Sequence, residues 1–410
     1  MINRMSRAGR VTAAVSIAAG AALALAACTP STGTGSAESS EASDQSAASQ
    51  AGAGARFVFA YDGGIKVLDA TTLEEVADLP IEGFNRINAL GDGEHMLVST
   101  EGGFQVLSTG AEGGEAELND VVFPATTPGH VVVHGGTTAL FDDGTGLVQL
   151  FDTEALADDD SKLPEIRTVE SAAPHHGVAV ELADGTVVRT IGTSEARTGA
   201  LVEDADGKEI ARNEECPGVH GEGVVKGEVV TIGCENGVLI WDGQSFTKLT
   251  SPDADYGRIG NEYASHESTI MVTDYNNDPD AEGVTLSHIG FVDTEAKTFE
   301  VIDMPEGVQY TWRGVRRDGE GDAWVLGTDG NLYPVDVQAR TIGEPIKVTG
   351  EWEGPNPWQE AHPALTVEGS VAWVTEPATM QVHRVDLSSG KVTSAKVGVA
   401  PNEVGLATGE

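Results

Sequence analysis

Hydrophobic residues in this chain gather in short runs separated by turns. Beyond Ala55 the runs are four to seven residues long and rich in Val, Ile, Leu and Thr, with Gly, Asp and Asn between them. No stretch there has the three-to-four-residue hydrophobic spacing of an amphipathic helix. The pattern predicts one all-β domain over residues 56–410.

The predicted strands recur in units of four. In the segment from His220 the runs HGEGVVKG, EVVTIGCEN, GVLIWDG and SFTKLTSP are joined by three turns. The successive units lie 40 to 51 residues apart and begin near Asn85, His130, His176, His220, Glu262, Arg313, His362 and Asn402. Four-stranded units at such a period predict a β-propeller.

The two ends of the predicted domain complement each other. The domain opens with three strands, RFVFAYD, GIKVLDA and EEVADLP, and it finishes with a single strand, NEVGLATG. Pairing the C-terminal strand with the N-terminal three would complete a blade and hide two open sheet edges. We therefore expect a ring of eight blades, or seven if the irregular unit at residues 262–308 is misassigned.

The first 55 residues have the composition of an export and anchoring segment. Three arginines precede an apolar, alanine-rich run that ends in Leu-Ala-Ala-Cys, and this ending resembles the lipobox of bacterial lipoproteins. We predict a lipoprotein signal peptide at residues 1–27, with an ordinary cleaved signal as the alternative. Lipidated Cys28 and a flexible tether of small polar residues would follow over residues 28–55. The protein would then lie outside the cytoplasm, on the outer face of the cytoplasmic membrane, touching it only through the lipid.

Charge and cysteine content narrow the class of protein. The chain has 65 acidic and 24 basic residues and a formal net charge of −41, so we expect no nucleic-acid partner. Apart from Cys28 the only cysteines are Cys216 and Cys234, and outside the cytosol such a pair is expected to form a disulfide. The propeller register places both on the face where the unit of His220 begins. We expect a monomer.

Histidine occupies the same register position in four of the units. In a propeller the first residue of each innermost strand lies at the mouth of the central channel. His130, His176, His220 and His362 take this position, and the first three belong to consecutive units. Zinc takes three or four nitrogen, sulfur or oxygen ligands at about 2.0–2.2 Å. We therefore predict a zinc site built from His130, His176 and His220.

The fourth ligand of this predicted site is left open by the sequence. The candidates are a water molecule, His362, His175, and the carboxylates of Asp142 and Asp143. Adjacent residues of a strand point in opposite directions, so His175 and His176 would not face one ion unless the backbone bends at Pro174. The alternative is that each histidine bonds backbone groups at a crowded strand start and binds no metal.

Several motifs resemble those of a known family. The strings PGHVVVHGGTTALFDDGTG, APHHGVAVELADGT, ECPGVHGEG and WQEAHPAL are similar to sequences of the AztD-type zinc metallochaperones, and the resemblance extends from Phe57 to the C-terminus. It implies an exported β-propeller that binds zinc and hands it to the solute-binding protein of a zinc ABC importer. Family members often carry a histidine-rich stretch, whereas the matching segment here, STGAEGGEAELND, has no histidine.

Two other classes of protein are compatible with a propeller fold. One is a lipid-anchored protein–protein interaction module without metal, which would purify without zinc and show no zinc-dependent melting temperature. The other is an enzyme. The chain contains no Gly-x-Ser-x-Gly nucleophile motif and no paired general acid and base, so catalysis is not expected.

Overall fold

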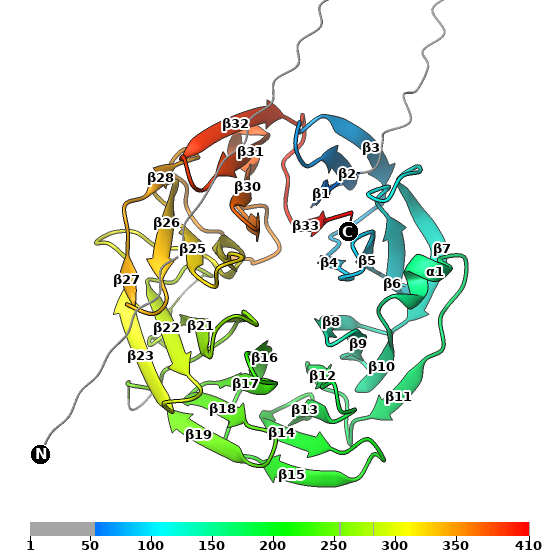
Figure 1. The fold of residues 1–410 in the computed structure, drawn as a ribbon, viewed down its shortest axis with the longest axis vertical. Coiled ribbons are helices and arrows are strands. Elements are labelled where there is room, and N and C mark those ends of the chain that lie inside the picture. Colours follow the sequence, from blue (N-terminus) through cyan, green and yellow to red (C-terminus); the bar gives the residue numbers. More distant parts are fainter. Residues whose placement is uncertain (1–53, 254–255, 282, 410) are drawn as a thin grey trace, which may run out of the picture. The chain divides into compact units, whose positions relative to one another are not determined.

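The computed structural model describes residues 54–253, 256–281 and 283–409. This part of the chain is nearly all β and is arranged as a ring of eight sheets (Figure 1). The predicted signal peptide, Cys28 and almost all of the predicted tether lie outside the described residues, so these assignments stay predictions. Among the described residues no helix has the length and hydropathy needed to cross a membrane.

The first four blades are formed by residues 56–213, together with the C-terminal strand β33 in blade 1. Blade 1 contains β33 (Val404–Ala407), β1 (Arg56–Tyr61), β2 (Gly64–Asp69) and β3 (Glu75–Pro80). Blade 2 contains β4 (Ile87–Ala89), β5 (His95–Thr100), β6 (Gly103–Ser108) and β7 (Glu117–Pro124). Blade 3 contains β8 (Pro128–His134), β9 (Thr137–Asp142), β10 (Leu147–Asp152) and β11 (Arg167–Glu170), with helix α1 (Ala155–Asp158) between the last two. Blade 4 contains β12 (Ala179–Glu181), β13 (Val187–Gly192), β14 (Arg197–Glu203) and β15 (Glu209–Asn213).

The other four blades complete the ring. Blade 5 contains β16 (His220–Val225), β17 (Val229–Cys234), β18 (Gly237–Trp241) and β19 (Phe246–Thr250). Blade 6 contains β20 (Glu262–Tyr263), β21 (Ile270–Tyr275), β22 (His288–Asp293) and β23 (Thr298–Asp303). Blade 7 contains β24 (Val315–Arg317), β25 (Ala323–Leu326), β26 (Asn331–Asp336), β27 (Thr341–Ile342) and β28 (Ile346–Lys347), preceded by 3-10 helix η1 (Trp312–Gly314). Blade 8 contains β29 (Leu365–Glu368), β30 (Val371–Glu376), β31 (Gln381–Asp386) and β32 (Lys391–Lys396), with 3-10 helix η2 (Pro377–Thr379).

The ring closes where its two ends meet. The C-terminal strand β33 pairs antiparallel with β1, from Arg56 opposite Ala407 to Phe59 opposite Val404, and the sheet order is β3-β2-β1-β33. Three N-terminal strands and one C-terminal strand therefore share a blade, as predicted. The irregular unit at residues 262–308 is a complete blade, so the count of eight is confirmed over seven.

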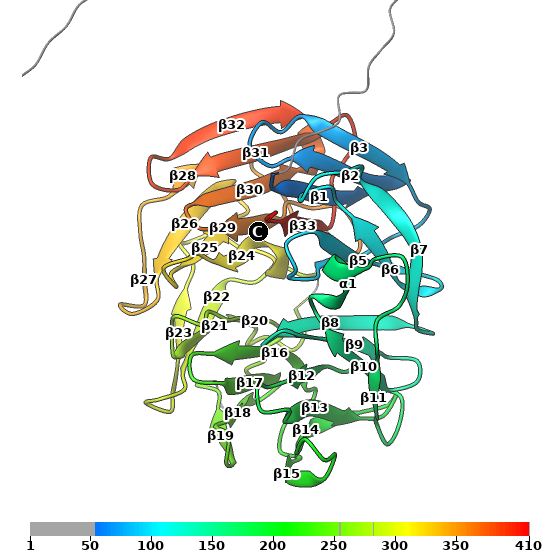
Figure 2. The ribbon, with the colours of Figure 1, turned by 45° about the vertical axis from the view of Figure 1, so that its right-hand side comes forward.

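Burial explains the long hydrophobic runs of the inner strands. In β1 the side chains of Phe57, Val58 and Phe59 are all fully buried, because the blade is covered on both faces by its neighbours. The outermost strand of the same blade, β3, alternates between exposed and half-buried positions. Figure 2 shows how the strands of blade 4, β12 to β15, follow one another outward from the middle of the ring. The hydrophobic cores accordingly lie between adjacent blades.

The inner strands of some blades begin later than the hydrophobic pattern predicts. His176 and His362 each stand three residues before their strands, β12 and β29, whereas His220 is the first residue of β16. Pro174 and Pro363 lie beside the two early histidines, and a proline supplies no N–H to a ladder. The register of the inner strands is nevertheless the predicted one to within three residues.

Candidate metal centre

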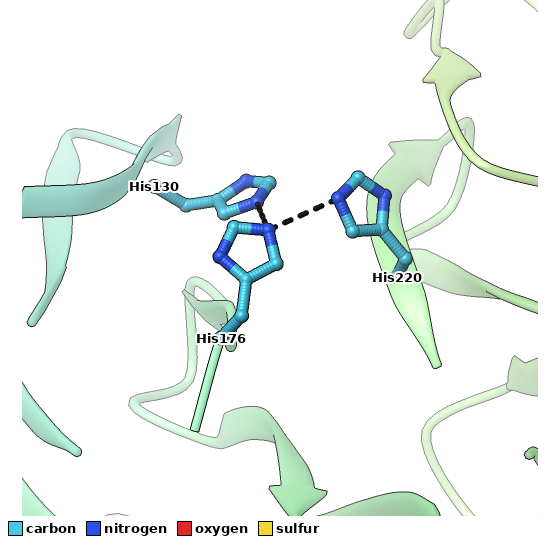
Figure 3. A group of neighbouring side chains, drawn as sticks. All are labelled: His130, His176 and His220. Atoms are coloured by element: carbon cyan, nitrogen blue, oxygen red, sulfur yellow. Dashed lines mark hydrogen bonds between the residues drawn. The ribbon is translucent and has the colours of Figure 1, made fainter. Parts of the chain in front are cut away.

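Three of the four histidines in the shared register come together. His130 from β8, His176 before β12 and His220 from β16 belong to the consecutive blades 3, 4 and 5, and their rings point toward one another (Figure 3). The Nε2 atoms of His130 and His176 are 3.3 Å apart, and those of His176 and His220 are 3.1 Å apart. Within the described residues this is the one group of three or more His, Cys, Asp or Glu side chains whose ligand atoms all lie within 4.8 Å.

Two irregular inner strands aim these rings inward. The β8–β9 register shifts between Pro128 and Val131, and the β16–β17 register shifts between His220 and Gly223. A shift of this kind turns a side chain away from the direction that regular pleating gives it. Gly221, next to His220, has a φ of +73°, and a Cβ there would lie 2.1 Å from Oε2 of Glu262. Only glycine satisfies both requirements.

The neighbouring blade fixes the orientation of two of the rings. Nδ1 of His176 lies 2.5 Å from Oδ2 of Asp143, which belongs to the turn between β9 and β10. Nδ1 of His220 lies 2.5 Å from the carbonyl oxygen of Gly260, in the segment before β20. A carbonyl or carboxylate oxygen can only accept, so both Nδ1 atoms carry the proton in the neutral ring. The Nε2 atoms of His176 and His220 are then unprotonated.

This arrangement calls for a cation. When both rings are neutral with the proton on Nδ1, the two Nε2 lone pairs are 3.1 Å apart and repel each other unless a positive charge lies between them. Four ligands arranged as a tetrahedron around zinc, at about 2.0–2.1 Å, place neighbouring nitrogens about 3.3 Å apart. The spacings of 3.3 Å between His130 and His176 and of 3.1 Å between His176 and His220 are close to that requirement. The donor set therefore fits a tetrahedral metal ion with one position left for a fourth ligand.

The environment of the cluster keeps two of the imidazoles neutral. Burial, followed by the charges of His220 and His176, lowers the pKa of His130 well below its ordinary value. Burial is also the main cause that lowers the pKa of His220, to about 3, with His176 and Arg258 contributing. A neutral imidazole is the form that binds a metal, so protons do not compete for these two rings near neutral pH.

The pKa of His220 predicts how stability depends on pH in the metal-free protein. Between an ordinary pKa of 6.5 and the folded-state pKa of about 3, the unfolded chain binds a proton that the folded chain does not. The free energy of unfolding should therefore fall as the pH drops from 6.5 toward 3. In denaturant titrations at pH 7, 6 and 5, we expect a smaller loss in His220→Gln than in the unmodified chain. Equal losses would show that His220 titrates alike in both states.

The two carboxylate candidates have different positions. The oxygens of Asp142 are engaged by the backbone and hydroxyl groups of Thr126, Thr127, Gly144 and Thr145, so this residue organises the turn. Asp143 contacts His176 on the side of the ring that faces away from the cluster, and its other oxygen accepts from the Gly177 N–H at 3.3 Å. Neither carboxylate stands among the Nε2 atoms. Asp143 instead holds His176 in place.

Asp143→Asn should weaken metal binding without removing it. The amide has no negative charge and presents the His176 Nδ1 proton with a poorer acceptor, so the ring loses its fixed tautomer. Removing such a partner of a ligand typically costs about 10- to 100-fold in metal affinity. Competition with a chromophoric chelator would measure the change. Asp62→Asn, an exposed turn position on blade 1, is the matched control and should leave the affinity unchanged.

The other two histidine candidates do not join the cluster. His175 is buried, with Nδ1 2.9 Å from the Ala173 carbonyl and Nε2 3.2 Å from the Thr190 hydroxyl, and it packs against Phe141. Its ring points into the blade because neighbouring residues of an extended segment face opposite ways. His362 lies on blade 8, where its Nδ1 is 2.7 Å from the Glu360 carbonyl and its ring stacks on Trp352. Two intervening blades on either side separate it from the trio.

The predicted disulfide is present beside this site. Cys216 and Cys234 are bonded and fully buried, and the bond ties the segment that leads into β16 to the last residue of β17. The linked segment carries His220 at its end. The disulfide therefore restrains one of the three rings.

A cavity of about 490 Å³ opens onto the three histidines. Its wall includes Arg86, Arg258, Trp312 and Trp358, which were not identified from the sequence. A single arginine or tryptophan before an inner strand gives no signal by itself, although Arg86 and Trp312 are each adjacent to a predicted unit start, Asn85 and Arg313. The side chain of His176 is 39% exposed, so the cluster can be reached from solvent.

Fold and site define the class: an eight-bladed β-propeller with a three-histidine cluster on its innermost strands. Over 80% of its length the chain is 25% identical to the zinc chaperone AztD of Citrobacter koseri, of which it covers 80%. The structure of apo AztD from Citrobacter koseri matches with a TM-score of 0.72 at 22% identity, covering 86% of this chain and 97% of that one. A second crystal structure of Citrobacter koseri AztD matches equally well.

No protein-family profile matches the chain. The resemblance to AztD that the sequence motifs indicate is nevertheless confirmed by the sequence relative, and the two solved structures show the same fold.

Proposed function

We propose that this protein is an extracytoplasmic zinc chaperone. It binds one zinc ion through Nε2 of His130, His176 and His220, and it passes the ion to the solute-binding protein of a zinc ABC importer. The single observation that carries this proposal is the convergence of three Nε2 atoms, with His176 Nε2 3.3 Å from that of His130 and 3.1 Å from that of His220. The similarity to a zinc chaperone supports zinc as the metal.

An open coordination position favours a carrier over a structural zinc site. Structural sites are closed by four protein ligands, whereas three histidines leave one position for an incoming group. That position faces the 490 Å³ cavity, so a ligand from another protein can bind zinc before a histidine releases it. Transfer by ligand exchange in a docked complex avoids free zinc. Signal-directed export and a lipid anchor at Cys28 would hold the chaperone beside the importer.

We propose a carrier and not an enzyme for a further reason. Among the described residues that line the cavity the one carboxylate is Asp274, and its oxygens accept from the N–H groups of Gly260 and Asn261 and from the Asn261 amide. A zinc hydrolase needs a free general base near the metal-bound water. Asp143 is also engaged, by His176.

Metal analysis of the purified full-length protein tests the proposal. After chelator treatment and dialysis against zinc, we expect one tightly bound zinc ion per chain. Zinc at a hundred times Kd should raise the free energy of unfolding by about 2.7 kcal/mol. Loaded protein is then mixed with the metal-free solute-binding protein, and the zinc content of each is followed after separation. Transfer should be faster than spontaneous loss of zinc to a small chelator. A chain that binds no zinc would instead fit a metal-free interaction module.

A further inference from the structure

The cavity next to the three histidines is positively charged in an acidic protein. The chain has 65 acidic and 24 basic residues, yet Arg86 and Arg258 both line this cavity. Zinc bound by three neutral imidazoles would keep its full double positive charge there. Such a concentration of positive charge favours an anionic occupant.

Arg86 has no counter-ion among the residues that the structure describes. Its guanidinium group lies 5.7 Å from the ring centre of Trp312 and 5.8 Å from that of Trp358. No described carboxylate forms an ion pair with it, and its buried Nε has no hydrogen-bond partner. The two indole rings attract the guanidinium without neutralising its charge. The side chain is thus held ready to bind an anion.

Two carboxylates at or near the cavity are already engaged. Asp274 accepts three hydrogen bonds from Gly260 and Asn261, at 2.6 to 3.0 Å. Glu235 lies 3.4 Å from Arg258, whose Nη1 also donates to the Gly218 carbonyl. Neither of these two carboxylates is therefore free to bind zinc or to pair with Arg86. Glu222 and Glu262, which line an adjoining cavity with Arg86 and His130, form no described ion pair with Arg86.

We propose that the fourth zinc ligand is a carboxylate from outside this chain, with one oxygen on zinc and the other accepting from Arg86. The inference rests on the proposed zinc site. The entering carboxylate replaces a zinc-bound water molecule, and no electron is transferred. A guanidinium binds a carboxylate through paired N–H donors, which gives the site its selectivity. The carboxylate belongs either to a small organic acid or to an Asp or Glu of the protein that receives zinc. If the carboxylate is an Asp or Glu of the receiving protein, it is the first group of that protein to bind the zinc ion.

Cobalt substitution allows the fourth ligand to be observed directly. Co²⁺ is bound to the full-length protein and the visible absorption bands are recorded while sodium acetate or the blocked peptide Ac-Gly-Glu-Gly-NH2 is added. We expect a saturable spectral change in the unmodified chain. Arg86→Gln should weaken acetate binding about tenfold or more, the cost of a charge-assisted hydrogen bond, while leaving Co²⁺ affinity nearly unchanged. If that variant does not fold, Arg86→Lys keeps the charge and loses the paired donors.

Arg197→Gln is the matched control. Arg197 also lies close enough to lower the pKa of His130 and of His220, but it lines a different cavity. Acetate affinity should stay near that of the unmodified chain, and an equal loss in both variants would overturn a specific role for Arg86.

Co²⁺ binding without any response to either probe would overturn the inference and leave the zinc site intact. Absence of Co²⁺ binding would instead overturn the proposed function. If the peptide binds more tightly than acetate, the fourth ligand is a carboxylate of a protein. If acetate binds more tightly, the fourth ligand is a small organic acid.

Discussion

His176→Gln is expected to abolish stoichiometric zinc binding while the propeller stays folded. His176 is the central ring of the cluster, with short Nε2 contacts to both His130 and His220. Loss of a residue that only orients a ligand costs about 10- to 100-fold in affinity, so loss of the ligand itself should cost more than about 100-fold. Zinc content after gel filtration and competition with a chromophoric chelator measure the effect. Circular dichroism should show an unchanged β-sheet signal, because the side chain is 39% exposed.

His362→Gln is the matched control for this prediction. It changes a histidine in the same register of a different blade, and its ring is committed to the Glu360 carbonyl and to Trp352. Zinc affinity should therefore stay within experimental error of the unmodified chain. If His362→Gln lost zinc and His176→Gln kept it, the assignment of the site to blades 3, 4 and 5 would be wrong.

The second large effect concerns the disulfide. Replacing both cysteines, in Cys216→Ala/Cys234→Ala, should lower the free energy of unfolding by about 3 kcal/mol, the value expected for a closed loop of this length. The two cysteines are 18 positions apart, and the crosslink restricts the unfolded chain over that interval. Denaturant titration with and without a reductant measures the change. The reduced unmodified chain should resemble the double variant.

Zinc binding distinguishes this effect from direct loss of a ligand. The disulfide restrains the segment that ends at His220, so its removal should weaken zinc binding less than His176→Gln does. A double variant with unchanged unfolding free energy would mean that the loop is already restrained by its backbone hydrogen bonds, such as that from Cys216 N–H to the Thr198 carbonyl.

Much of the fold could be predicted because the repeat is regular. Each unit carries the same order of hydrophobic runs and turns, and a propeller blade can bury its faces only against its neighbours. The unmatched strands at the two ends then require closure between β1 and β33, which the structure contains. The starts of β12 and β29 were predicted less well, because the strand pairing of each begins three residues after its histidine.

The site could be predicted only in part. The register identified four histidines, but it does not show which of their rings converge. His362 has the same register as the others and lies on a blade that is not next to the cluster. The roles of Asp143 and Gly260 depend on contacts between blades, over 33 and 40 positions of sequence. Turn conformation decides such contacts. Arg86 is recognisable only when Trp312 and Trp358, more than 200 positions away, are seen next to it.

The sequence by itself determined the strand units, their period, the closure of the ring, the pairing of two cysteines and the shared position of the histidines. These features follow from local hydrophobic pattern and from counting, because a repeat makes sequence neighbours into spatial neighbours. The tertiary structure alone decided that His130, His176 and His220 meet, that Asp143 orients one of them, and that Arg86 lines their cavity with no counter-ion among the residues that the structure describes. Shifted strand registers and turns of adjacent blades set these directions, and such distortions leave no periodic trace in the sequence.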